Sequence, residues 1–341
     1  LAYCVEWLVV WMLVLYLGFT MLNIAHNSWG TFLANDYDER SKLFGWREIF
    51  IIVGMIFVLA IPATMDFFGE SSTPAKVAGM GLFCLILFPI TVVATLVFVP
   101  DKVTERKEAP GWRDFLGILR SNPLLWRLLT ADFTTSFAIS ATAALYIFVA
   151  TYAFDLQDQA SMALLLYFVA GFLAMPAWLK LTYCVGKVGA IKLAMGYTMV
   201  LQSGLFFVTE PGNVGLFWSY TFLAGLAFGA TPTLLHSMMA DLTDIDELKT
   251  EQKRAGMYFA LLGTISKLGG AVAVGLTLTI ADRVFNFTPG TENSQAAVNG
   301  LLLIFCFAPV TAMALTYLPL HHYPLTKEKH AEIRRSLLVE E

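Results

Sequence analysis

Long apolar segments alternate with short polar connections along the whole chain. Nine of these segments reach the length of roughly 20 residues that a helix needs to cross a hydrocarbon core about 30 Å thick. Because the backbone can satisfy its hydrogen bonds inside lipid as a helix, the pattern predicts an all-α polytopic membrane protein. The predicted spans are residues 3–30, 47–65, 77–100, 126–153, 161–181, 188–209, 214–240, 254–281 and 297–320.

The composition supports a membrane protein and gives no sign of enzyme chemistry. Hydrophobic residues make up 57% of the chain and charged residues only 14%, against about a quarter charged in soluble domains. The four cysteines stand singly without metal spacing, and no span joins a nucleophile to a histidine base. We therefore expect no enzyme activity, no metal and no cofactor. The basic residues form no patch that would bind nucleic acid.

The basic residues predict the orientation of the spans. Of the 22 lysines and arginines, 19 fall in alternate connections or in the tail, and the opposite connections hold only Lys76 and Arg283. The positive-inside rule places the basic regions in the cytoplasm. The C-terminus is then cytoplasmic and Leu1 lies outside. The basic regions are residues 35–47, 101–127, 180–192, 249–254 and the tail from 321.

A polar sequence pattern occurs twice. Residues 34–47 and 240–254 each follow an apolar segment, run from acidic to basic residues, and close on an arginine that opens the next segment. Six apolar segments separate the copies, which is typical of the parallel six-helix halves of major facilitator transporters. The pattern predicts nine of twelve helices here, with three more expected ahead of Leu1. The predicted domains are 1–100, a remnant of the N-terminal bundle (helices 4–6); 101–125, a cytoplasmic linker with an interfacial helix; 126–320, the C-terminal six-helix bundle; and 321–341, a cytoplasmic tail.

A single lysine stands inside the apolar segment that follows the second copy. Lys267 comes thirteen residues after Arg254, which places it about 20 Å along a helix and past the middle of the membrane. A charge at that depth costs roughly 2.5–3.5 kcal/mol on insertion scales, so it is interpreted first as part of a site. The alternative is a structural lysine bonded to a carbonyl or carboxylate.

Polar residues also gather at the end of the first span. Asn23, His26 and Asn27 offer amide and imidazole hydrogen bonds within two turns, and Arg47 opens the next span. Such groups suit a hydroxyl-rich solute. Alternatively, these polar residues gather only because the helix emerges into the cytoplasm, and Arg47 pairs with an acidic residue as part of a gate.

The charges of both copies suit a cytoplasmic gate. Carboxylates and guanidinium groups at adjacent helix ends can pair in one state and separate in another, although a solvated loop has the same composition. The gate residues predicted are Asp36, Asp38, Glu39, Arg40, Asp241, Asp244, Asp246, Glu247 and Arg254.

Three further features fall on the spans. Asp132 is expected to lie only about 9 Å into its helix and to reach the interface, and His236 could pass a proton or simply pack. Gly225 and Gly229 form a GxxxG pattern, which favours close helix packing.

Two stretches resemble the glycoside-pentoside-hexuronide:cation symporter family, the melibiose permease relatives within the major facilitator superfamily. They are MLNIAHNSWGTFLANDYDERSKLFGWREIF and ADLTDIDELKTEQKRAGMYFALLGTISKLGG. The resemblance implies that Lys267 borders the cation site, with Thr264 beside Gly263 where a cation-site threonine is expected. It also implies a sugar-pocket role for Arg47. Asn23 and Asn27 replace the family's aspartate and tryptophan, and the family's coupling carboxylates lie on a helix that this sequence does not contain.

These observations predict a secondary active transporter in a bacterial inner membrane. We expect a monomer among membrane lipids that carries a sugar, glycoside or uronate by symport with H⁺ or Na⁺, through alternating access. The alternatives are a major facilitator carrier of another solute, such as a lysolipid, and a non-transporting membrane sensor.

Overall fold

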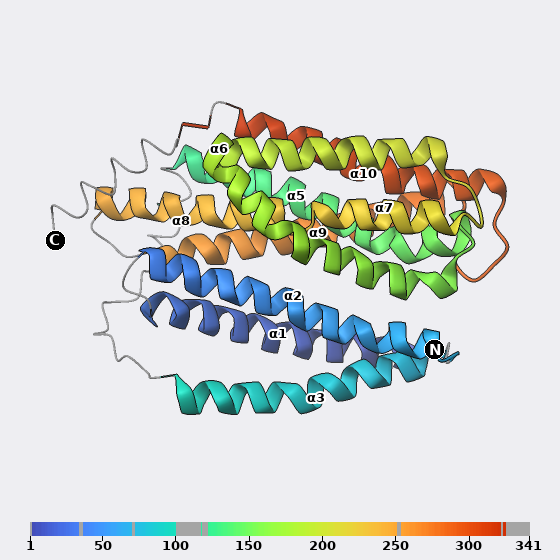
Figure 1. The fold of residues 1–341 in the computed structure, drawn as a ribbon, viewed down its shortest axis with the longest axis horizontal. Helices are drawn as coiled ribbons and strands as arrows, with labels where there is room; N and C mark the ends of the chain where they lie inside the picture. The colour runs from blue at the N-terminus through green and yellow to red at the C-terminus, as the bar shows by residue number, and fades with distance from the viewer. Residues whose placement is uncertain are drawn as a thin grey trace. The chain divides into compact units, whose positions relative to one another are not determined.

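The computed structural model describes residues 2–33, 37–69, 72–99, 117, 122–250, 254–321 and 323–324, and these form long helices joined by short connections (Figure 1). A π-helical turn, Val149–Ala153, continues α5, and a 3-10 turn, Gln157–Gln159, precedes α6. The helices are α1 Ala2–Leu33, α2 Tyr37–Phe67, α3 Thr73–Phe98, α5 Pro123–Phe148, α6 Ala160–Val208, α7 Val214–Leu226, α8 Ala230–Thr250, α9 Ala255–Arg283 and α10 Gln295–Leu320.

The described helices confirm the predicted number of spans. Nine segments are long and apolar enough to cross a membrane, and each begins within four residues of its predicted start. Two of them, 157–182 and 184–208, belong to α6, whereas α7 and α8 together make one, 214–246. The protein is therefore an all-α multi-pass membrane protein.

The chain divides into two compact units. One contains residues 1–54 and 86–109, and the other contains 55–85 and 110–341. The second unit includes the six helices α5 to α10, which lie side by side and are called the bundle below (Figure 1). The predicted linker 101–125 lies outside the described residues except at Gly117 and 122–125, so its interfacial helix stays a prediction.

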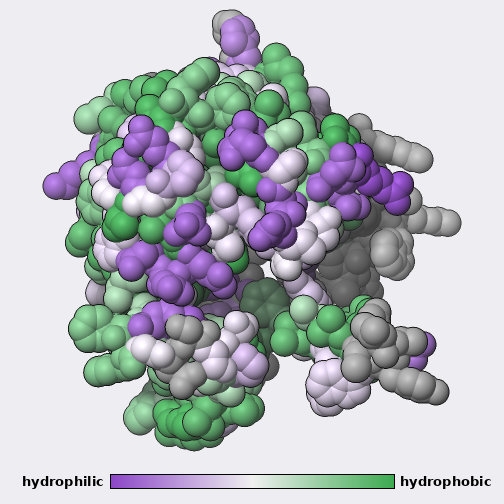
Figure 2. Space-filling model, turned by 90° about the vertical axis from the view of Figure 1, so that its right-hand side faces the viewer, coloured by the Kyte–Doolittle hydropathy of each residue, from purple (hydrophilic) through white to green (hydrophobic). Residues whose placement is uncertain are grey.

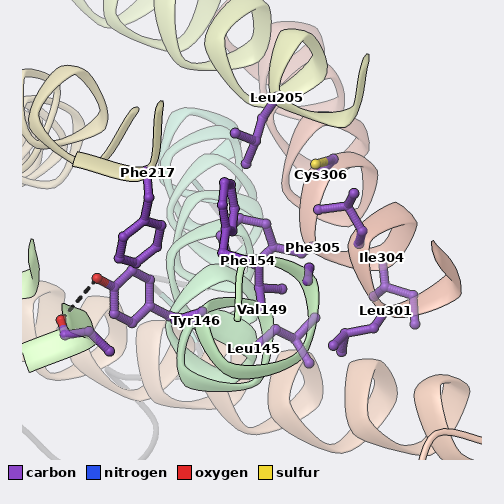
Figure 3. Close-up of a cluster of buried hydrophobic side chains, with 14 of the residues drawn as sticks. Leu145, Tyr146, Val149, Phe154, Leu205, Phe217, Leu301, Ile304, Phe305 and Cys306 are labelled. Carbon is purple, nitrogen blue, oxygen red and sulfur yellow. Dashed lines mark hydrogen bonds between the residues drawn. The ribbon is translucent and has the colours of Figure 1, made fainter. Parts of the chain in front are cut away.

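One apolar core of the bundle forms around the π turn that continues α5. Tyr146 and Phe154 both pack against Phe217 from α7, with their ring centroids 6.1 and 5.0 Å, respectively, from that of Phe217 (Figure 3). Leu205 from α6 and Phe305 from α10 complete the group. The Tyr146 hydroxyl donates to the carbonyl of Ala160 at 3.1 Å, so this polar group is satisfied inside the core.

A second apolar core fills the opposite end of the bundle, where α5 and α9 begin. Its members come from five helices, so it fixes the ends of those helices together. The largest are Leu125, Leu128, Ile191, Met195, Leu235, Met238, Met239 and Tyr258, all fully buried.

Polar side chains start three of the bundle helices. Asn122 accepts from the N–H groups of Leu124 and Leu125, both at 3.2 Å, at the start of α5. Asn213 caps α7 in the same way, and Ser294 caps α10. These side chains satisfy N–H groups that have no partner within a helix.

Gly186 divides α6 into its two spans. Its φ of 73° lies in the left-handed region, which side chains other than hydrogen rarely adopt. The backbone at Gly186 is not helical, so α6 consists of two helical arms, in agreement with the two spans that the sequence predicted separately.

The span 214–246 is interrupted between α7 and α8. Gly229 has a φ of 76°, and two carbonyl groups before it accept from side chains of α6. The Trp178 indole donates to Leu226 O at 2.6 Å, and the Tyr197 hydroxyl donates to Leu223 O at 2.8 Å. A helix break at membrane depth is tolerated when the freed backbone groups are satisfied in this way.

Gly225 lies at the closest approach of α6 and α7. A Cβ atom there would lie 2.2 Å from the carbonyl oxygen of Tyr167. The GxxxG prediction is therefore right for Gly225, whereas Gly229 serves the helix break.

Hydrophilic and hydrophobic groups separate on the surface. On the face that Figure 2 shows, hydrophilic side chains gather in the middle, with hydrophobic ones around them. The bundle connections contain the exposed acids Asp155, Asp158, Glu210 and Glu292. The distribution fits a helical bundle whose connections lie in water.

Candidate functional site

Two of the predicted binding residues meet in the first unit. The Arg47 guanidinium (Nη2) of α2 donates to the Asn23 carbonyl oxygen (Oδ1) of α1 at 3.4 Å. The Asn23 amide also donates to Phe19 O at 3.1 Å, which fixes its orientation. Both side chains are half-buried. An amide and a guanidinium held together can bind hydroxyl and carboxylate oxygens.

Other predicted residues of this region are described only in part. Asn27 lies on α1, and Asp38, Glu39 and Arg40 lie in the first turns of α2, but their side chains fall outside the described part of the chain. Asp36 is outside it altogether. Their predicted roles stay predictions.

Lys267 and Thr264 share one exposed face of α9. Lys267 lies twelve residues after Ala255 and sixteen before Arg283, close to the middle of the helix. Thr264 is three residues earlier and therefore on the same side. Its hydroxyl donates to Ala260 O at 2.8 Å, which leaves the oxygen lone pairs to face a cation. Gly263 has no atom within 4 Å of an added Cβ.

An ion pair between Arg254 and Asp246 joins the end of α8 to the start of α9. The guanidinium donates through Nε at 3.0 Å and through Nη2 at 2.9 Å to the two carboxylate oxygens. Both side chains are largely buried, with exposed fractions of 13% and 11%. The Tyr258 hydroxyl lies near this pair and accepts from the Asn122 amide at 3.4 Å. Two predicted gate residues thus form a bidentate ion pair at the ends of three helices.

Asp241 forms a second ion pair, with a partner that the gate prediction did not include. The Lys187 ammonium lies 2.5 Å from the Asp241 carboxylate, and Asp241 is only 6% exposed. Lys187 follows the turn at Gly186, so the pair joins α6 to α8. Of the remaining gate residues, Asp244 is half-buried, and the Glu247 side chain falls outside the described part.

The structure also shows a polar contact that the sequence did not indicate. Asp132 of α5 is 2% exposed and bonds to the Ser266 hydroxyl of α9. The sequence placed Asp132 near the interface, but α5 begins at Pro123, so nine residues put it about 14 Å along the helix. The packing of α9 across this side of α5 buries it.

A small cavity lies beside the break between α7 and α8. Its volume is about 60 Å³, and its lining includes Thr135, Tyr167, Thr198 and Thr231. It can hold a few waters but not a sugar, since ligand pockets usually exceed about 300 Å³. The buried Thr135 hydroxyl has no hydrogen-bond partner among the described residues, and water could supply one.

No cluster of three or more histidine, cysteine, aspartate or glutamate side chains that could hold a metal ion occurs in the described part of the chain. The polar groups found there are suited to binding a solute or a proton.

Comparisons with known proteins match nearly the whole chain. A family model described as MFS/sugar transport protein matches residues 2–327. An uncharacterized symporter of Synechocystis is 27% identical over 246 residues, which cover 68% of this chain and 45% of that protein. The chain thus spans less than half the length of this relative.

Two further relatives carry names that state a cargo. The sodium-dependent lysophosphatidylcholine symporter 1 of Xenopus tropicalis is 20% identical over 379 aligned positions, covering 97% of this chain and 70% of the relative. A protein of Escherichia coli K12 named for glycoside/cation symport is 23% identical over 335 residues, covering 96% of this chain and 71% of the relative.

Proposed function

This chain belongs to the MFS/sugar transport protein family, and from that membership we propose that it carries a small polar solute across a membrane by symport with a cation. The family consists of symporters, and the described helices supply nine membrane-length spans. We propose a sugar, glycoside or uronate as the solute.

The contact between Asn23 and Arg47 carries the choice of solute. It pairs an amide with a guanidinium at 3.4 Å on half-buried side chains, and a hydroxyl-rich or carboxylate-bearing solute can use both groups. Hydrogen bonds to a charged group contribute about 1.5–3 kcal/mol. Removal of the guanidinium should therefore weaken solute binding roughly 10- to 100-fold.

Lys267 is proposed to take part in coupling. It lies near the middle of α9, and a charge at membrane depth is costly enough to indicate a role in transport. Thr264 shares its face and offers an oxygen ligand. The coupling ion is proposed to be H⁺ or Na⁺.

The experiment is uptake into proteoliposomes that contain the purified protein. Labelled glycosides and uronates are offered with an imposed Na⁺ gradient, an imposed pH gradient, or neither. We expect accumulation above the equilibrium level with one gradient. Lys267→Ala should remove this accumulation, whereas Lys180→Ala, at an exposed site of α6, should not.

Arg47→Gln tests the binding site in the same vesicles, with Arg283→Gln at the exposed end of α9 as its control. A KM that stays at the wild-type value in Arg47→Gln would remove the binding role. Accumulation that remains fully coupled in Lys267→Ala would remove the coupling role. Failure of every solute to accumulate would favour a non-transporting sensor.

A lysolipid is the second candidate solute, because one relative is named for sodium-dependent lysophosphatidylcholine symport. The phosphate of such a lipid could bind Arg47 or Lys267. Labelled lysophosphatidylcholine therefore belongs in the same panel. Gradient-dependent uptake of this lipid in the absence of glycoside uptake would establish it as the cargo.

We propose a cytoplasmic C-terminus in a bacterial inner membrane. The support is the concentration of 19 of 22 basic residues in alternate connections and the tail, together with the exposed acids in the opposite connections of the bundle. Cysteines introduced at Asp158 and at His321 should react with a membrane-impermeant thiol reagent from opposite sides. Reaction of both from the same side would contradict this topology.

A further inference from the structure

The carboxyl group of Asp132 is buried inside the bundle, and none of the described lysines and arginines pairs with it. Only 2% of the residue is exposed, and in the described part of the chain its one hydrogen bond comes from Ser266. No lysine or arginine there lies within ion-pair distance of it. Among the titratable groups described on α6, α8, α9 and α10, only the His236 imidazole acts on it electrostatically.

Asp241 shows how the same bundle treats a buried carboxylate that stays charged. It is 6% exposed, comparable to Asp132, but the Lys187 ammonium lies 2.5 Å away. An ionised carboxylate without such a partner costs several kcal/mol in a low-dielectric interior. Among the residues that the structure describes, a cation pairs with one buried aspartate and none pairs with the other.

The hydrogen bonds around Ser266 suit a protonated Asp132. The Ser266 hydroxyl has one proton and two acceptors in reach, Asp132 Oδ2 and Leu262 O, the latter at 3.0 Å. With Asp132 ionised, the hydroxyl can donate fully to only one of them. With Asp132 protonated, the carboxyl donates to Ser266 Oγ and the hydroxyl donates to Leu262 O, so both bonds form.

His236 lies near enough to this buried group to act on it electrostatically. It is exposed on α8, and its ring stacks on Phe259 with centroids 6.4 Å apart. Its Nδ1 lies 2.8 Å from Pro232 O, which accepts the Nδ1 proton, so Nε2 is the nitrogen that remains for another hydrogen bond. The imidazole is thus placed to respond to the charge of Asp132.

The contact between Asp132 and Ser266 lies in a closely packed helix interface. At Gly269 of α9 an added Cβ would lie 2.6 Å from Phe133 O of α5, and at Gly270 it would lie 3.0 Å from the Ser140 hydroxyl. Close-packed interfaces transmit small changes because they have few alternative arrangements. A change in the charge of Asp132 therefore acts directly on how α5 and α9 pack.

We propose that Asp132, Ser266 and His236 form a proton-binding site inside the bundle, with Asp132 holding the proton and His236 exchanging it with water. We further propose that proton release from this site drives transport, a second step that rests on the function proposed above. The site would make H⁺ the coupling ion and places its binding group on α5.

Infrared difference spectroscopy, which compares the wild type with each variant, tests the proton-binding site in the purified protein in lipid. It needs no solute. At neutral pH the wild type should show the carbonyl-stretch band of a protonated carboxyl, and Asp132→Asn should lose it. Asp241→Asn is the matched control, because that carboxylate is paired with Lys187 and should contribute no such band. A band that persists unchanged in Asp132→Asn overturns the site.

Ser266→Ala keeps the test valid if Asp132→Asn does not fold. Loss of the hydroxyl partner should shift the frequency of the Asp132 band, because a hydrogen bond lowers the stretching frequency of a carboxyl group. A wild-type spectrum that Ser266→Ala leaves unaltered overturns the site as well.

The second step is tested by uptake of whichever labelled glycoside or uronate the wild type accumulates. Asp132→Asn should bring accumulation driven by a pH gradient down to the equilibrium level, while solute exchange without a gradient continues. Coupled accumulation in Asp132→Asn overturns the link to transport. Absence of transport by the wild type overturns the proposed function and this link, whereas the infrared result decides the proton site independently.

Discussion

The contact at Gly225 sets the distance between α6 and α7, and Gly225→Ala tests it. The added Cβ would lie 2.2 Å from Tyr167 O and 2.9 Å from the Tyr167 carbonyl carbon. These are backbone atoms, which cannot rotate away as a side chain can. The two helices must separate by about 1 Å, and a gap of that size removes a quarter to a half of the dispersion energy of the contacts that it opens.

The expected change in the free energy of unfolding of Gly225→Ala follows from two opposing effects. Overpacking costs about 1–3 kcal/mol, and the rigid obstacle places this site at the upper end. Replacement of glycine by alanine in a helix returns about 1 kcal/mol. The net loss should be about 2 kcal/mol, which for a protein of this size lowers Tm by about 3 °C.

Thermal unfolding in detergent, followed by circular dichroism, measures this loss. Gly275→Ala is the control, since it lies inside α9 with no atom within 4 Å of an added Cβ. Its Tm should stay level or rise by about 1 °C. A Gly225→Ala protein as stable as the wild type would show that α6 and α7 do not approach as closely as described.

Three further substitutions test single contacts of the bundle by the same measurement. Lys187→Met removes the ammonium that pairs with the Asp241 carboxylate, which is 6% exposed, and should cost about 3 kcal/mol; adding Asp241→Asn should recover most of the loss, and no recovery would contradict the pairing. Arg254→Lys keeps the charge but loses one of the two bonds to Asp246, so a loss of about 1 kcal/mol is expected. Gly186→Ala places a side chain at a φ of 73° and should cost about 1–2 kcal/mol; an unchanged Tm would argue against that turn.

The spans could be predicted from the sequence because length and apolarity alone decide them. In lipid, an apolar segment such as 297–320 can form all its backbone hydrogen bonds as a helix, whereas a strand could do so only in a closed barrel. Apolarity does not predict where the chain changes direction within an apolar segment. The break before α8 depends on Trp178 and Tyr197, which come from α6 and receive the freed carbonyls.

Candidate site residues could be proposed from the sequence only where a polar group stands out against an apolar background. Lys267 does so within a span, and Asn23 and Arg47 do so at span ends; their roles stay predictions. Asp132 did not, because its burial and its bond depend on Ser266, 134 residues further along the chain. Its helical position alone suggested a carboxylate near water, and the packing of α9 decides otherwise.

The interruption between α7 and α8 means that the two helices of this span need not move together. The carbonyls of Leu223 and Leu226 accept from side chains of α6, so these two groups do not depend on hydrogen bonds to α8. We expect α8 to be able to tilt at this point, and His236 to move with it, while α7 stays anchored to α6. In the proposed transporter, such a tilt would move one half of the span and leave the other half in place.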